Sequence, residues 1–171
     1  MKKLFLILCI TLVSMEVFAQ KGEKAIGLNL SYGTEISNLG IGAKGMYNFT
    51  NAIRVEAGFD YFLKKNYVSM WDINVNAHYL FPIAEKFKVY PLVGLTYTNW
   101  KLDGNSLMGD IDGIPMEDEN YDASTGKFGV NLGAGIQYDI TDKWAVNFEL
   151  KYQLISDFNQ AVFGIGIAYK F

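Results

Sequence analysis

Apolar and polar residues alternate along most of the chain beyond residue 23. The final segment, from Ala161 to Phe171, reads AVFGIGIAYKF, with a large apolar residue at almost every second position and small or polar residues between. A period of two places successive side chains on opposite faces of an extended backbone. The pattern therefore predicts a β-strand with one apolar face and one small or polar face.

Eight stretches share this alternation. They are residues 24–33, 39–49, 53–63, 70–81, 87–100, 127–139, 144–154 and 161–171. Each has at least the roughly 9–11 residues that a tilted strand needs to cross a bilayer. The connections after the second, fourth and sixth stretches are short (50–52, 82–86 and 140–143), whereas 101–126 is much longer. This predicts an all-β fold, an eight-stranded antiparallel up-and-down transmembrane β-barrel with its short turns at the inner end.

Charge is confined to one face of the predicted strands. The charged and ionisable residues on this face include Lys44, Arg54, Glu56, Asp60, Asp72, His78, Glu149 and Lys151. A soluble ligand-binding barrel would turn its apolar face inward, but an eight-stranded barrel has room only for its own side chains. So many Phe, Tyr, Trp and aliphatic residues would overfill that space, and most glycines share the charged face, as a narrow interior requires. We therefore expect the charged face to line the lumen.

Aromatic residues collect toward both ends of the apolar face. Tyr47, Tyr79 and Trp144 lie near the predicted inner ends, and Tyr32 and Trp71 lie near the outer ends. Between them the apolar positions are mostly Leu, Ile, Val and Ala. Two aromatic girdles around an aliphatic belt are typical of outer membrane barrels.

The first residues have the pattern of a secretory signal peptide. Lys2 and Lys3 precede an apolar run that is too short to span a bilayer, and small or aliphatic residues lead up to Ala19. We expect a signal peptide at 1–19 and a barrel domain at 20–171. The only cysteine, Cys9, falls within the signal peptide, which excludes disulfides and thiol chemistry in the mature chain. The net charge of −3, without a basic patch, argues against nucleic acid as a partner.

With its signal peptide, eight strands, girdles and terminal Tyr169-Lys170-Phe171, the chain resembles the OmpA/OmpX-like small outer membrane β-barrel family. The resemblance covers the whole mature chain. It implies a Gram-negative outer membrane location, membrane lipids as partners, and recognition of Phe171 by the barrel-assembly machinery. It rests on pattern rather than on a catalytic motif, so it implies fold more strongly than activity.

The lumen charges allow two interpretations. Ionisable residues inside a membrane often form a proton or ion path. Alternatively, paired charges plug the lumen, and the narrowness of the barrel favours this second interpretation. A lipid hydrolase is also conceivable, but His78 is the only histidine and no serine is expected beside it, so we predict no catalytic residues and no cofactor.

The long loop at 101–126 is the other candidate site. It is rich in acidic residues, among which Asp103, Asp110, Asp112 and Glu117 are weak candidates for calcium or magnesium ligands. Their spacing does not complete an EF-hand, and a solvated, self-repelling loop accounts for them as well. Interspersed Leu, Ile and Met residues could contact the barrel rim or an unknown protein or surface ligand.

The sequence thus favours a non-enzymatic outer membrane barrel with a structural or surface-interaction role through its outer loops. The alternative is an accessory factor in protein secretion or envelope assembly. A soluble ligand-binding barrel is the third hypothesis.

Overall fold

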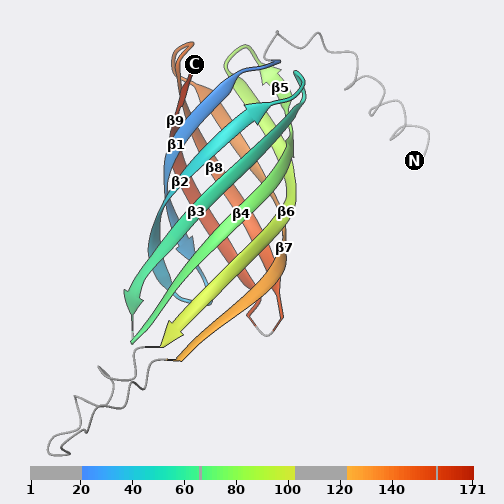
Figure 1. The fold of residues 1–171 in the computed structure, drawn as a ribbon. Helices are drawn as coiled ribbons and strands as arrows, with labels where there is room; N and C mark the ends of the chain where they lie inside the picture. Colours follow the sequence, from blue (N-terminus) through green and yellow to red (C-terminus); the bar gives the residue numbers. More distant parts are fainter. Residues whose placement is uncertain (1–20, 66, 103–122, 157) are drawn as a thin grey trace, which may run out of the picture.

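The computed structural model describes residues 21–65, 67–102, 123–156 and 158–171, and these form nine β-strands (Figure 1). The strands are β1 (Lys24–Gly33), β2 (Asn38–Asn48), β3 (Ile53–Lys65), β4 (Val68–Tyr79), β5 (Phe81–Ala84), β6 (Phe87–Leu102), β7 (Ala123–Asp139), β8 (Trp144–Ile155) and β9 (Gln160–Lys170). No helix in these four ranges is long and apolar enough to cross a membrane.

The strands close into one antiparallel barrel. Each long strand pairs with its neighbours along the chain, β9 pairs with β1, and β4 pairs with β6. The eight long strands are the eight that the alternation predicts, and the closed eight-stranded barrel is confirmed. Closure leaves no long strand with an unpaired edge.

Strand β5 differs from the expectation that 82–86 is simply a turn. Leu80 is buried in the interior, and its backbone N–H donates to the carbonyl of Ala52 (2.7 Å), which ends the regular ladder of β4. Beyond it the chain pairs with β6 alone, through Phe81 opposite Val89 and Pro82 opposite Lys88. Leu80 occupies the inward phase of β4, so Tyr79, Leu80 and Phe81 form an unbroken apolar run in which alternation no longer marks the end of the strand.

The β6–β7 hairpin is also longer than predicted. Pairing continues to Lys101 opposite Ser124 and Leu102 opposite Ala123, which belong to the segment expected to be loop. In Figure 1 the yellow β6 and orange β7 run side by side to the lower end of the barrel. The small, polar run from Ala123 to Gly126 has no apolar alternation, so only the pairing reveals its strand structure.

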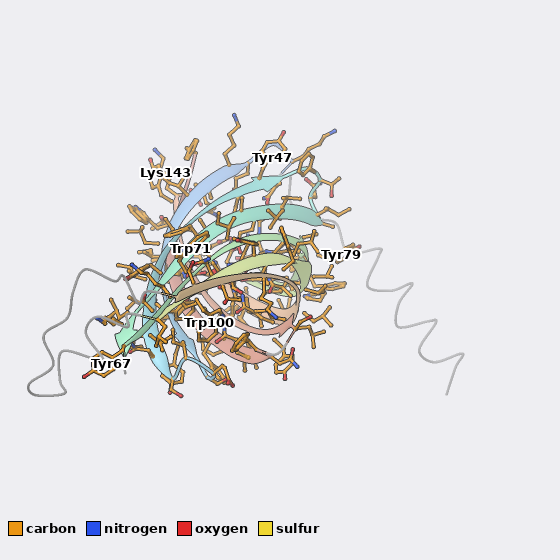
Figure 2. All side chains as sticks on the ribbon, turned by 60° about the horizontal axis from the view of Figure 1, so that its bottom comes forward. Tyr47, Tyr67, Trp71, Tyr79, Trp100 and Lys143 are labelled. Carbon is orange, nitrogen blue, oxygen red and sulfur yellow. The ribbon has the colours of Figure 1, made fainter. Side chains whose placement is uncertain are left out.

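Large apolar side chains point outward along the whole wall, as Figure 2 shows for the labelled Tyr47 and Tyr79 among many others. The predicted girdles contain ring pairs at both ends. At the end with the short turns Trp144 contacts Tyr169, with centroids 5.1 Å apart, and Phe87 contacts Tyr138 at 4.8 Å. At the other end Trp71 and Tyr97 are 5.8 Å apart. We call these the short-turn end and the long-loop end.

A first prediction concerns Gly133, on the inner face of β7. A Cβ placed there would lie 2.3 Å from the carbonyl oxygen of Leu150 and 2.7 Å from Cα of Lys151, so backbone would have to move. We expect Gly133→Ala to lower the free energy of unfolding by about 1–3 kcal/mol, as overpacking does. Urea unfolding in phospholipid vesicles, followed by tryptophan fluorescence, measures the difference.

Gly45→Ala is the matched control. Gly45 faces outward, and a Cβ there would meet nothing within 4 Å. Because alanine is favoured over glycine inside a strand, this variant should unfold at the same or a higher urea concentration. Equal losses for the two variants would contradict the close packing of the lumen at Gly133.

Candidate functional site

The lumen contains all eight of the charged and ionisable residues that the sequence assigns to it. They come from four strands: Lys44 (β2), Arg54, Glu56 and Asp60 (β3), Asp72 and His78 (β4), and Glu149 and Lys151 (β8). Seven of them are at most 7% exposed, and the side chain of Glu149 is 12% exposed. The structure brings them into two neighbouring groups and a contact around His78.

The first group is an ion triad that crosses the barrel. Nζ of Lys44 lies 3.0 Å from Oε2 of Glu56 and 2.9 Å from Oε1 of Glu149. The same Glu149 oxygen accepts hydrogen bonds from the Tyr90 hydroxyl (2.7 Å) and from Nδ2 of Asn147 (3.1 Å). One buried cation thus stabilises two buried carboxylates that come from opposite sides of the lumen.

The second group surrounds two aspartates. Asp60 and Asp72 are directly opposite each other on β3 and β4, an unfavourable arrangement for two carboxylates. Lys151 compensates, with Nζ 3.7 Å from Oδ2 of Asp60. Neutral donors complete the site: Asn74 donates to Oδ1 of Asp72 (2.6 Å) and Gln153 to Oδ2 (3.1 Å).

Arg54 and His78 form a different kind of contact. Arg54 donates to Nδ1 of His78 from Nε (3.1 Å) and Nη2 (2.9 Å), and to Oε1 of Gln137 from Nη1 (2.6 Å). A guanidinium can only donate, so Nδ1 must be the accepting nitrogen of a neutral imidazole. The ring of Tyr90 stacks on His78 and lies 4.8 Å from Cζ of Arg54. These partners of Arg54 are neutral, whereas the sequence led us to expect lumen charges paired with charges of opposite sign.

Amide side chains are the part of the lumen that the sequence reasoning missed. Asn131 donates to the amide oxygens of Asn74 (2.8 Å) and Asn76 (2.9 Å), and Gln160 donates to Gln153 (2.6 Å). All five are nearly completely buried. These amides occupy the same phase of their strands as the charged residues. That phase could have placed them in the lumen.

Apolar clusters close the lumen toward its ends. At the long-loop end Ile36, Phe62, Met70 and Val162 pack together, and Trp100 packs against them. At the short-turn end Ala25, Met46 and Ala168 form a smaller cluster. Phe62 and Met70 occupy the polar phase of their strands, so these exceptions to the alternation are the signal for the outer cluster.

Little space remains between these side chains. The cavity lined by Lys44, Glu56, Asp60, Glu149 and Lys151 has a volume of about 20 Å³, and one at the short-turn end has about 10 Å³. A single water needs about 10–15 Å³. These two cavities thus accommodate isolated waters rather than a column of water.

Glu56, His78 and Glu149 come close enough to suggest a metal site, with one potential ligand atom from each within 4.8 Å of the others. Lys44 already lies against both carboxylates, however, and its charge opposes a second cation there. The loop candidates Asp103, Asp110, Asp112 and Glu117 lie outside the described residues.

Comparisons with known proteins agree with this architecture. Outer membrane protein X of Escherichia coli K12 is 23% identical over 149 residues, which cover 87% of this chain and 76% of that protein. The β-barrel domain of Pseudomonas aeruginosa OprF superposes with a TM-score of 0.69 at 15% identity, covering 90% of this chain and 100% of that one. Ail, the attachment invasion locus protein of Yersinia pestis, superposes with a TM-score of 0.60 at 20% identity, covering 88% of this chain and 99% of that one.

The family model for the outer membrane protein beta-barrel domain matches residues 5–171, nearly the whole chain. The lipid environment follows from the fold, because the outward face of the barrel is apolar between two aromatic girdles. The chain therefore belongs to the outer membrane protein beta-barrel domain family, and it is a Gram-negative outer membrane protein.

Proposed function

We propose that this protein is a non-enzymatic outer membrane barrel that acts as a rigid scaffold for surface interactions of its outer loops. The observation that carries the proposal is the filled lumen, in which Lys44 joins carboxylates from β3 and β8 across the barrel. Such a cross-link connects opposite sides of the wall, and the two small cavities between the described lumen side chains have room only for isolated waters. A rigid barrel holding variable loops is a common arrangement for binding proteins.

The environment of His78 argues against lipid hydrolysis. Its Nδ1 accepts from Arg54, and its ring is stacked on Tyr90 deep in the lumen, at 1% exposure. A hydrolase of the serine type needs a hydroxyl nucleophile in reach of the base, and a face that the lipid can enter. Arg54 occupies the nitrogen through which the imidazole could act as a base.

The long segment between β6 and β7 is the proposed interaction site. Its acidic residues, with interspersed Leu, Ile and Met, suit a solvated loop that presents apolar anchors to a protein or surface ligand. The similarity to Ail, whose name describes attachment, agrees with a surface role. At the inner end we propose that Phe171, 64% exposed, is the residue that the barrel-assembly machinery reads.

The closed lumen predicts that the barrel does not conduct ions across a bilayer. We expect the purified protein to give no stable, ion-selective openings in planar lipid bilayers, because the cavities hold only isolated waters. Single-channel recording measures this directly. An added bacterial porin checks the bilayer, and reproducible openings that change in Lys44→Met would contradict a plugged barrel.

A loop deletion separates the two functional hypotheses. We expect replacement of residues 103–122 by a short Gly/Asn turn to leave the barrel folded and secretion intact, but to reduce adhesion of the cells or alter envelope permeability. The matched control replaces the short turn at 140–143 with another turn. A secretion defect in a strain without the protein, restored by the loop-deleted form, would instead favour an accessory role in secretion or envelope assembly.

A further inference from the structure

A groove of about 540 Å³ opens on the outside of the barrel, near the short-turn end. Two outward-facing rows of residues define it. One row runs across four strands through Trp144, Tyr169, Ile26 and Gly45, which are successive cross-strand partners. The volume is in the range of about 300–1,000 Å³ that small-molecule sites occupy.

The groove exists because β2 carries small residues where β1 and β9 carry large ones. Gly45 and Ala43 form the floor, whereas Leu28 of β1 and Ile167 of β9 rise beside it in the second row. The lining is almost entirely apolar, which suits an extended hydrocarbon chain lying along the wall.

Apart from Lys44, whose charged end lies in the lumen, the polar side chains near the groove gather at its mouth. Trp144 and Tyr169 lie there, and both residue types favour the level of the lipid headgroups. The next outward position of β1 is Lys24, which pairs with Tyr47, and its carbonyl accepts from the N–H of Phe171 (2.9 Å). Lys143 directly precedes Trp144 in an exposed turn. The mouth therefore presents two exposed lysines beside an aromatic collar.

The acidic residues in this region do not cancel these charges equally. Glu23, next to Lys24, is turned toward Lys170 of the lumen, with the oxygen and Nζ 3.9 Å apart. Asp142 is exposed in the same turn as Lys143 and offsets part of its charge.

We propose that this groove binds one anionic phospholipid of the phosphatidylglycerol class from the inner leaflet. An acyl chain fills the hollow over Gly45 and Ala43, Trp144 and Tyr169 pack against the glycerol region, and the lipid phosphate lies between Lys24 and Lys143. Charge complementarity favours this occupant over a second copy of the barrel, because a two-fold contact at this face would bring the Lys24 side chains of both copies together.

Quenching of Trp144 by brominated lipids tests the proposal. Trp71→Phe and Trp100→Phe leave Trp144 as the only one of three tryptophans. The protein is reconstituted in phosphatidylcholine vesicles containing increasing fractions of brominated phosphatidylglycerol or, in parallel, brominated phosphatidylcholine. We expect phosphatidylglycerol to bind at least about fivefold more tightly than phosphatidylcholine. One lysine near the surface contributes about 1 kcal/mol, which is this factor, and the second lysine adds to it.

Two variants separate the two parts of the site. Lys24→Gln/Lys143→Gln should bring the ratio of the two binding constants close to one without touching the barrel wall. Gly45→Leu should fill the hollow and weaken binding of both lipids at Trp144, and its Cβ has open space. Native mass spectrometry should find one retained phosphatidylglycerol on the parent protein and none on either variant.

A second groove supplies the matched control. It has about 530 Å³, lies at Pro91 and Ala134, and is equally apolar. Ala134→Leu should fill it and leave the quenching of Trp144 unchanged. The proposal would be overturned if the parent protein bound the two lipids equally, or if the double lysine variant kept the parent's ratio of binding constants. Retention of a second copy of the barrel in place of lipid would also overturn it.

Discussion

Replacement of Lys44 by methionine is expected to lower the free energy of unfolding of the barrel by about 3–5 kcal/mol, because it leaves two buried carboxylates without their cation. Nζ of Lys44 is 3.0 Å from Glu56 and 2.9 Å from Glu149, and the other nearby basic group, Nε2 of His78 at 3.9 Å from Glu56, belongs to a neutral imidazole. Methionine keeps most of the volume, so the loss reports charge rather than a cavity. Urea unfolding in phospholipid vesicles, followed by tryptophan fluorescence, measures it.

Two controls identify the cause. Lys24→Met removes an exposed lysine from the neighbouring strand and should change stability by much less. The triple variant Lys44→Met/Glu56→Gln/Glu149→Gln removes the whole triad and should recover most of the loss, since no uncompensated charge remains. A triple variant as unstable as Lys44→Met alone would show that packing, not charge pairing, dominates at this site.

The second large effect is expected on the opposite face. Val93, 52% exposed on the outside of β6, lies between Phe87 of the inner girdle and Tyr97 of the outer one. Val93→Arg should cost about 2–4 kcal/mol of unfolding free energy, because its guanidinium would lie near the bilayer midplane. The same vesicle unfolding experiment measures it.

Leu63→Arg is the matched control for depth. Leu63 is also about half exposed, but it lies beyond Tyr61 toward the long-loop end of β3. There the cost of arginine should fall to about 0–1 kcal/mol, since the side chain reaches the headgroups. Equal costs at Val93 and Leu63 would contradict the placement of the bilayer between the two girdles.

Most of the barrel could be predicted because alternation carries two kinds of information at once. It gives the extended conformation, and, through segregation of charge, it also gives the face that turns inward. Lys44 and Glu149 are 105 residues apart, yet both could be assigned to the lumen from phase alone. The assignment depends on the narrowness of an eight-stranded barrel, which cannot hold a large set of aromatic side chains.

The partners of these lumen residues could not be predicted in the same way. The alternation in β3 predicts that Arg54 points inward. It does not predict that the guanidinium donates to His78 rather than to a carboxylate. Partners depend on the stagger of the strands around the barrel, because that stagger decides which side chains meet across the lumen. The alternation of apolar and polar residues has a period of two whatever the stagger of the strands. It therefore cannot predict which side chains meet across the lumen.

The sequence by itself determined the eight strands, the inward and outward faces, and the aromatic girdles, since each follows from the period of two in single strands. Only the tertiary structure decided the rest: the ion triad of Lys44, the break at Leu80 that begins β5, and the apolar cluster of Phe62 and Met70. The physical reason is that closure brings together side chains from strands that are distant in sequence. Their fit depends on register and volume, which the alternation of one strand does not contain.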